Sequence, residues 1–456
     1  MRGVCVAAVV WGMSLQAGDA PEPLVRLITL DPGHFHAALI HKEELPEVAR
    51  DVHVYAPLGP DLAAHLGRIA AYNRRERNPT HWRLDVRAGD DYFERFLAER
   101  PGNVVVLSGR NRGKLARIKA AVDAGLHVLA DKPWVIEAAD LPLLDATLDA
   151  AAARGVVAYD AMTQRFETTC LLQKALVNDP AVFGECLPGT AEEPAVSMES
   201  LHYLLKQVSG VPSLRPVWFF DVGEQGEGLA DVGTHLADLV AWTLCEERML
   251  DPRGDTRLVG AARRPTMLSA ADFERVTGVR GFPEFLAGAV EDGGLAYFCN
   301  TRVDYTLRGV HVRLAVAWDF APAPGEADRS SAVFRGTRAR VEVRQGKDEG
   351  FVPQVFVVPN DAGRKAEVLA AVGRRLASLA GEFPGLAAED LGDRIGIAIP
   401  AALRTGHEAH FALLVRRFIE YVRQPASLPS WEAAHMRAKY FVTTEGVAAA
   451  RRAASR

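Results

Sequence analysis

A lysine stands directly after a short apolar run, in the segment Ala130-Asp131-Lys132-Pro133. The run before it, residues 127–130, predicts a buried strand of a parallel sheet. Ligands of such sheets bind beyond the carboxyl ends of the strands. A lysine held there can donate a hydrogen bond to a substrate hydroxyl, and its charge can stabilise a developing alkoxide. By position alone, however, a surface lysine before a proline turn is the better interpretation of Lys132.

A glycine-rich segment, residues 226–238, contains a second set of groups that could do chemistry. Asp231, His235 and Asp238 are spaced i, i+4 and i+7, so all three share one face if the segment is helical. A histidine with a carboxylate one turn away is a good general base near neutral pH. For an isolated pair, a capping aspartate and a hydrogen-bonded core histidine explain the pattern slightly better, and both interpretations stay open.

The turn Asp31-Pro32-Gly33 has the position of a phosphate-binding turn, because it lies between a predicted strand (25–30) and a predicted helix (36–42). Such turns use glycines for tightness and for close approach of the backbone to a pyrophosphate. Only Gly33 remains of the pattern G-x-G-x-x-G, since Asp31 and His36 occupy the outer glycine positions. Taken alone the signal is weak, and its place between strand and helix supports it.

Two features of this turn leave alternatives open. His34 and His36 either face a cofactor or only pack and cap, and the sequence favours neither. An acid that could hold a ribose would be expected about 20 residues further on. The nearest one is Asp61, so the preference between NAD and NADP is undetermined.

Other patterns do not support a site. His407 and His410 are three residues apart, whereas the metalloprotease helix needs four, and Gly406 before them indicates a helix start. The five cysteines form no CxxC pair, so we expect neither a structural zinc site nor a disulfide framework, and no metal. Ser108 and Ser197 lack the context of a nucleophile elbow.

The elements that must position these groups fall into two classes. Strands alternate with helices of about 10–15 residues up to about residue 165, which predicts βαβ units and a doubly wound parallel sheet. After it, strands such as 310–319, 340–343 and 355–358 follow one another without long helices, which indicates a mostly antiparallel open sheet. We therefore expect an α/β protein with a Rossmann domain over residues 24–165 and a C-terminal α+β domain over residues 166–456.

Composition excludes several classes of protein. The 456 residues carry a formal net charge of −5, from 53 basic and 58 acidic residues, so no nucleic-acid partner is expected.

Residues 1–20 combine Arg2, an apolar stretch and a small-residue exit, like a weak secretory signal peptide. This favours a periplasmic or secreted protein, with a cytoplasmic location as the alternative. No later segment is apolar and long enough to span a membrane.

Three of these segments, in this order, resemble the Gfo/Idh/MocA family of oxidoreductases, which includes glucose–fructose oxidoreductases and inositol dehydrogenases. Residues 104–133 resemble its cofactor loop followed by A-x-x-A-G-x-H-V and E-K-P, with Asp131 in place of the usual Glu. Residues 158–166 are similar to its strand ending in an Arg–Phe pair, and residues 228–238 to its D-x-G-x-H helix. The likeness spans roughly residues 25–238. The details of the turn at residues 31–39 and the long C-terminal half resemble a divergent bacterial branch of this family.

The resemblance implies a role for each candidate residue. Lys132 would bind a substrate hydroxyl and the nicotinamide, His235 would be the acid/base, and Asp231 would orient the substrate or His235. The residues expected to line the NAD or NADP cofactor are Gly33, His34, Phe35, Ser108, Asn111, Lys132 and Arg165. The weakened glycine turn puts cofactor affinity in question.

The function implied is hydride transfer between NAD(P) and a secondary alcohol of a sugar, cyclitol or related polyol. One alternative is a glycoside-cleaving enzyme that reuses its NAD within each turnover, and another is a non-catalytic ligand-binding module. Retention of Lys132, Asp231 and His235 argues against the binding module. By family likeness the partner is a small carbohydrate-like molecule, and the exposed face of the C-terminal sheet would form a homo-oligomer.

Overall fold

The computed structural model describes residues 23–208 and 211–454. The predicted leader, residues 1–20, lies outside these ranges and stays a prediction. Among the helices described, none is at once apolar and long enough to cross a bilayer. Cys170, Cys186, Cys245 and Cys299 carry free thiols.

Six short strands near the N-terminus pair in parallel in one sheet, in the order β3-β2-β1-β4-β5-β6. The strands are β1 (Leu27–Leu30), β2 (Asp51–Ala56), β3 (Arg83–Ala88), β4 (Val104–Leu107), β5 (His127–Ala130) and β6 (Ala158–Asp160). All residues of β1 and β4 are buried, which explains their continuous apolar sequences. The predicted Rossmann sheet is confirmed. The strand order reverses between β1 and β4, so a crevice opens at the carboxyl ends of these two strands.

Helices cover both faces of this sheet, and each face has its own apolar core. They are α1 (His36–Leu39), α2 (Pro60–Arg74), α3 (Tyr92–Glu99), α4 (Lys114–Asp123) and α5 (Leu141–Arg154). Gly155, which follows α5, is left-handed with φ 65°, as its position at the helix end predicts. Helix α1 is shorter than the predicted 36–42, because the N–H groups of His41 and Lys42 donate to carbonyls only three residues back.

The second sheet has ten strands, and β13 pairs β7 in parallel while the other neighbours are antiparallel. Its strands are β7 (Val196–Tyr203), β10 (Thr256–Leu268), β11 (Val290–Glu291), β12 (Gly294–Leu307), β13 (Val310–Asp319), β14 (Arg329–Arg335), β15 (Ala339–Gln345), β16 (Gln354–Pro359), β17 (Ala387–Asp390) and β18 (Ile395–Ala398). A separate hairpin pairs β8 (Lys206–Val208) with β9 (Val211–Ser213). Burial alternates along β13, as its period-two pattern predicts.

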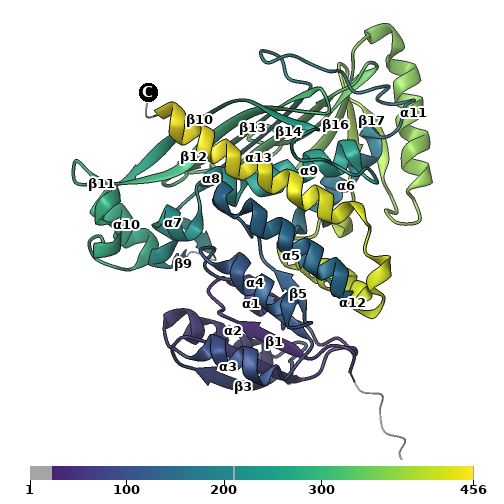
Figure 1. The fold of residues 1–456 in the computed structure, drawn as a ribbon. Helices are drawn as coiled ribbons and strands as arrows, with labels where there is room; N and C mark the ends of the chain where they lie inside the picture. Colours follow the sequence, from purple (N-terminus) through teal and green to yellow (C-terminus); the bar gives the residue numbers. More distant parts are fainter. Residues whose placement is uncertain (1–22, 209–210, 455–456) are drawn as a thin grey trace, which may run out of the picture.

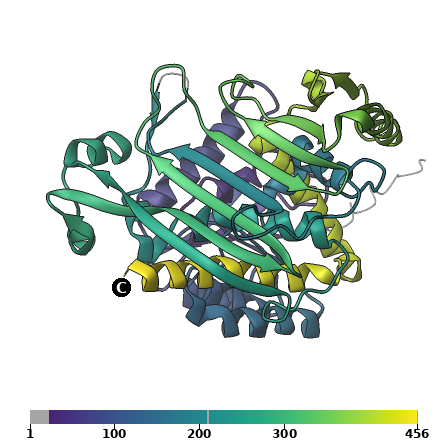
Figure 2. The same cartoon turned by 90° about the horizontal axis from the view of Figure 1, so that it is seen from above.

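Helices pack on one face of this large sheet, and the other face is open (Figures 1 and 2). The helices of this half are α6 (Thr168–Val177), α7 (Val222–Gln225), α8 (Gly228–Asp231), α9 (Gly233–Cys245), α10 (Ala270–Thr277), α11 (Lys365–Ser378), α12 (His407–Arg423) and α13 (Trp431–Ala454). Helix α13 runs under the large sheet, between it and the N-terminal domain (Figure 1). Most of the apolar side chains between sheet and helices form one continuous core.

The last two helices also belong to the packing of the N-terminal domain. Phe411, Leu414 and Phe418 of α12 share a core with Val52 and Val54 of β2. On α13, the hydroxyl of Tyr440 accepts a hydrogen bond of 2.9 Å from the N–H of Trp134, two residues after Lys132. Residues far along the chain thus fix the position of the loop that follows β5.

Candidate active site at the carboxyl edge of the parallel sheet

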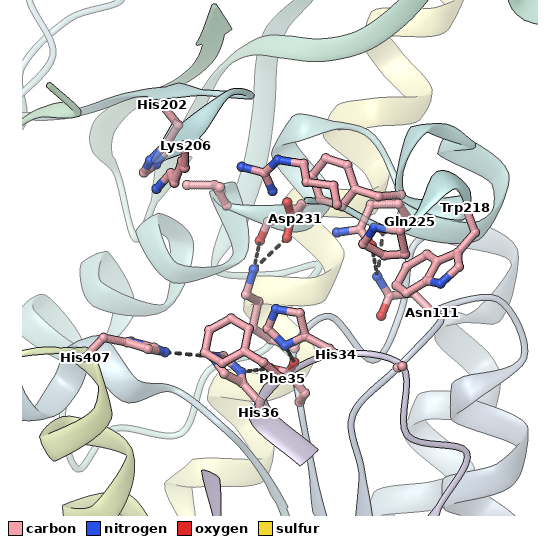
Figure 3. Close-up of a pocket in the computed structure, with 18 of the residues that line it drawn as sticks. His34, Phe35, His36, Asn111, His202, Lys206, Trp218, Gln225, Asp231 and His407 are labelled. Carbon is pink, nitrogen blue, oxygen red and sulfur yellow. Dashed lines mark hydrogen bonds and ion pairs between the residues drawn. The ribbon is translucent and has the colours of Figure 1, made fainter. Parts of the chain in front are cut away.

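A cavity of about 530 Å³ lies at this carboxyl edge, between the parallel sheet and the large sheet. Figure 3 shows many of the side chains that line it, which come from both halves of the chain. Seven predicted site residues are in the lining, namely Gly33, His34, Phe35, Asn111, Lys132, Asp231 and His235. Ser108 and Arg165 are not in this lining. The cavity therefore brings together residues that stand in four separate segments of the sequence.

Lys132 and Asp231 form the central ion pair of the cavity. The ammonium of Lys132 lies 2.6 Å from Oδ1 of Asp231 and donates a second hydrogen bond of 3.2 Å to the backbone carbonyl of the same residue. Burial alone would raise the pKa of Asp231, but the adjacent ammonium outweighs it, so this pKa lies below its usual value. Lys132 is thus a fixed cation at the end of β5, which the sequence left undecided.

Asp231 and His235 do not share one continuous helix. Asp231 ends α8, Val232 follows, and His235 lies in the first turn of α9. Both side chains reach the cavity, but within the described residues no hydrogen bond joins them. Nδ1 of His235 is buried and has no hydrogen-bond partner among residues 23–208 and 211–454. Burial and the nearby Lys132 hold the pKa of His235 well below its usual value, so its imidazole is neutral at neutral pH and can accept a proton.

Asp238 serves a different purpose from the one its spacing suggested. Its carboxylate receives two hydrogen bonds from Arg165, of 2.6 and 2.7 Å, and one of 3.0 Å from Lys439. Arg165 also bonds both carboxylate oxygens of Glu432 on α13, at 2.7 and 2.9 Å. This buried network ties the end of β6 to α9 and α13. Arg165, which the resemblance assigns to the cofactor, is buried in this network and is not in the cavity lining, whereas the neighbouring Thr163 and Gln164 are.

The turn after β1 approaches the turn after β4 very closely. A Cβ added at Gly109 would lie 2.5 Å from the carbonyl oxygen of Asp31, and one at Gly33 would lie 3.2 Å from Cα of Gly109. The N–H groups of Gly33 and His34 both donate to the carbonyl of Ser108, at 2.9 Å. Ser108 therefore holds the two turns together from beneath the cavity, and neither of those N–H groups is available to a phosphate.

A second cavity, of about 430 Å³, lies on the other side of the turn, at the end of β2. Its lining includes Asp61, Arg110, Arg112 and Arg117. The two cavities flank the glycine turn at the point where the strand order reverses, which is where dinucleotides bind in doubly wound folds. The position and the absence of side chains at Gly33 and Gly109 fit a dinucleotide lying across the turn.

A cluster of histidines lies on the floor of the first cavity, and the sequence suggested only part of it. Nδ1 of His34 and Nδ1 of His36 lie 2.9 and 3.0 Å from the two carboxylate oxygens of Asp131. Nε2 of His407, at the start of α12, is 2.7 Å from Nε2 of His36 (Figure 3). His407 is where a helix start was expected, but no pattern along the chain links it to residue 36, and only the packing of α12 on the sheet brings the two together.

The side of the cavity formed by the large sheet was also missed by sequence reasoning. Trp318 and His202 come from strands β13 and β7 of this sheet, while Lys206, Arg215 and Phe219 come from the part of the chain after β7. Nδ1 of His202 lies 3.0 Å from Asp328, and the ammonium of Lys206 lies 2.8 Å from the same carboxylate. Aromatic surfaces next to fixed polar groups are common in small-molecule sites. None of these residues stands in a recognisable motif.

Comparison with a family model and with solved structures finds similarity to oxidoreductases. Residues 172–451 match the family model described as "Putative oxidoreductase C terminal domain". A crystal structure described as that of a "putative oxidoreductase" from Parabacteroides merdae is 41% identical, with a TM-score of 0.91, over 94% of this chain and 98% of that one. No curated protein matches this sequence.

More distant solved structures share the fold. Levoglucosan dehydrogenase, in complex with NADH and levoglucosan, is 14% identical with a TM-score of 0.58, over 94% of this chain and 97% of that one. KijD10, a 3-ketoreductase from Actinomadura kijaniata in complex with NADP and TDP-benzene, is 16% identical with a TM-score of 0.54, over 92% and 96%. At this identity the likeness concerns the fold alone.

Proposed function

This chain belongs to the Gfo/Idh/MocA-type oxidoreductases, and from this premise we propose that it transfers hydride between NAD(P) and a secondary alcohol of a sugar, cyclitol or related polyol. The observation that carries the proposal is the Lys132–Asp231 ion pair beside the neutral imidazole of His235, in one cavity at the carboxyl edge of the sheet. These groups match what removal of a hydroxyl proton requires.

Each residue has a separate task in the oxidation direction. The nicotinamide, when bound, supplies the acceptor for the hydride that leaves the carbinol carbon with its electron pair. An imidazole nitrogen of His235 accepts the hydroxyl proton as the carbonyl forms. The ammonium of Lys132 donates to the same substrate oxygen and stabilises its developing negative charge. Asp231 fixes the direction of Lys132 through the 2.6 Å contact. In the reduction direction His235 returns the proton.

The cofactor lies, in this proposal, across the turn between the two cavities. Gly33, His34, Phe35 and Asn111 would hold it from the first cavity, and the cavity at the end of β2 would take the adenosine half. Two relatives of this fold carry NADH or NADP in their structures, which supports the class of cofactor but not the choice between NAD and NADP.

The substrate lies between Lys132 and the large sheet. The aromatic rings of Trp318 and Phe219 offer apolar faces, while His202, Lys206 and Arg215 offer polar groups that suit a molecule with several hydroxyls. The carbohydrate-like ligand in levoglucosan dehydrogenase supports this substrate class. We also propose that the open face of the large sheet forms a homo-oligomer, which light scattering of the purified protein would test.

Mass spectrometry of the purified, undenatured protein tests the cofactor directly. We expect a bound nicotinamide dinucleotide, or saturable binding when NAD or NADP is added to the empty protein. A protein that carries neither and binds neither overturns the proposal. Substrate class is then tested with a panel of sugars and cyclitols, by following reduced nicotinamide.

The same experiment separates the proposal from a redox-neutral glycosidase. Turnover of free NAD with a polyol supports net oxidation. A retained cofactor, together with cleavage of a glycoside and no change in free NAD, would instead favour internal recycling of the cofactor. Deuterium at the carbinol carbon should appear on the nicotinamide in the first case.

A further inference from the structure

We propose that His34, His36 and Asp131 form a binding site for one divalent transition-metal ion, with the preferences of zinc, on the floor of the cavity. One ligand atom from each residue lies within 4.8 Å of the other two. Two imidazoles and one carboxylate are a frequent ligand set for zinc and for related ions. Hydride transfer from an alcohol to a nicotinamide does not itself need a metal, so this site goes beyond the proposed function.

The unsatisfied atoms of the cluster carry the inference. Nδ1 of His34, Nδ1 of His36 and Oδ1 of Asp131 are buried, and within the described residues none has a partner in hydrogen-bonding geometry. The histidine nitrogens nevertheless lie only 2.9 and 3.0 Å from the carboxylate oxygens. Two ligand atoms held about 2.0–2.2 Å from one ion are separated by roughly 3 Å at a right angle and by roughly 3.3–3.6 Å at the tetrahedral angle, so a bound zinc ion needs these contacts to lengthen by only a few tenths of an ångström.

The outer contacts fit metal ligands as well. Metal-binding histidines usually donate their second N–H to a neighbour, which fixes the tautomer and leaves the first nitrogen free to bind. Nε2 of His36 has such a neighbour in Nε2 of His407, at 2.7 Å. The carboxylate of Asp131 is oriented in the same way, because the hydroxyl of Ser108 donates to its Oδ2 at 3.0 Å.

The charges around the cluster favour the binding of a cation. Asp131 contributes a buried carboxylate, and its side chain is only 6% exposed. The two nearby lysines point elsewhere. The ammonium of Lys132 is held by Asp231, and that of Lys114 donates to Asn111 and to the backbone carbonyls of Asp131 and Pro133.

The ion would have an open coordination position. Three protein ligands plus one exchangeable position are typical of a catalytic zinc ion. The His34 side chain is 39% exposed and lines the cavity together with Lys132. An exchangeable water can therefore bind the ion from the cavity, beside Lys132.

Metal analysis of the tag-free, full-length protein tests the site. After incubation with zinc and dialysis, we expect one zinc ion per chain in the wild type. Cobalt(II) should give the visible absorption bands of a low-symmetry site with nitrogen ligands. His34→Ala is the first variant, because its partly exposed side chain makes misfolding least probable. Its zinc affinity should fall at least about 100-fold, and His407→Ala should lower the affinity about 10–100-fold.

His53→Ala is the matched control, because its Nδ1 also lies near a carboxylate, 3.2 Å from Asp85, but within the part of the chain that the structure describes it belongs to no group of three possible metal ligands. It should bind zinc like the wild type. Equal zinc content in His34→Ala and the wild type, or no cobalt spectrum in the wild type, would overturn the inference. NAD(P) binding is measured separately, so failure of the metal site and failure of the proposed function are distinguishable.

Discussion

The ammonium of Lys132 lies 2.6 Å from Oδ1 of Asp231, although 99 residues separate the two along the chain. Lys132 stands two residues after strand β5 of the parallel sheet, and Asp231 is the last residue of the short helix α8. The pair therefore joins the two halves of the protein at the point where we place the substrate. A buried pair of this kind costs desolvation energy, which is tolerated where its charges are used.

Replacing Lys132 with alanine should lower turnover at least about 100-fold, because a positioned cation beside the reacting oxygen is lost. Lys119→Ala is the control, since Lys119 forms a surface pair with Asp123 on α4. Steady-state kinetics on both variants check the prediction. Asp231→Asn should act through the same interaction, so the double variant should lose much less than the sum of the two single losses. If the losses of the two single variants simply added in the double variant, Lys132 and Asp231 would not act through one interaction.

Replacing His235 with alanine should lower turnover about 100-fold to 10,000-fold, the usual range for a general acid/base. Because burial and Lys132 hold the pKa of His235 well below the usual histidine value, the wild-type imidazole stays neutral through neutral pH. Alcohol oxidation should therefore decline only in acid, below the usual titration range of histidine. A pH profile of kcat/KM checks this prediction. If the decline in acid were the same in His235→Ala as in the wild type, His235 would not be the general base.

Gly109→Ala should weaken dinucleotide binding at least about tenfold, because the new Cβ would lie 2.5 Å from the carbonyl oxygen of Asp31 and force the two turns apart. Gly67→Ala on α2 is the matched control, since nothing lies within 4 Å of the position of its Cβ. Binding can be followed by calorimetry with NAD and NADP. Equal affinities in the two variants would show that the turns do not shape the cofactor site.

Arg165→Leu should destabilise the protein by about 3–5 kcal/mol, because it leaves Asp238 and Glu432 buried without their main partner. Arg416→Ala, which removes a surface pair with Glu43, should change stability little. Urea unfolding of the two variants provides the comparison. If Arg165→Leu kept full stability but lost cofactor affinity, Arg165 would act at the cofactor and not in the buried network.

Stability should fall as the pH drops from about 6.5 towards 4, in part because of His65. Burial lowers the pKa of His65 to about 4, so the unfolded chain binds its proton first in that window. His65→Leu should flatten the dependence. Relative to the wild type, the variant should gain roughly 2 kcal/mol between pH 8 and pH 5. Urea titrations at both pH values test this, and parallel losses in the two proteins would contradict it.

Local patterns predicted much of this molecule. The apolar run 127–130 is strand β5, and residues 310–319 form β13 as their alternation predicts. Such patterns follow from burial on one or both faces of a sheet, which is a property of neighbouring residues. The order of the segments around Lys132, Asp231 and His235 also indicated the family, because spacing along the chain is preserved in the fold.

Distant contacts could not be predicted in the same way. The sequence placed Asp231, His235 and Asp238 on one helical face, but a break at Val232 and the buried partners Arg165 and Lys439 send Asp238 into the core. The contact between His36 and His407 crosses 371 residues. The sequence by itself determined the elements and the catalytic candidates, since these depend on local spacing. Tertiary structure decided which charges meet, because packing of α12 and α13 on the sheet selects each partner.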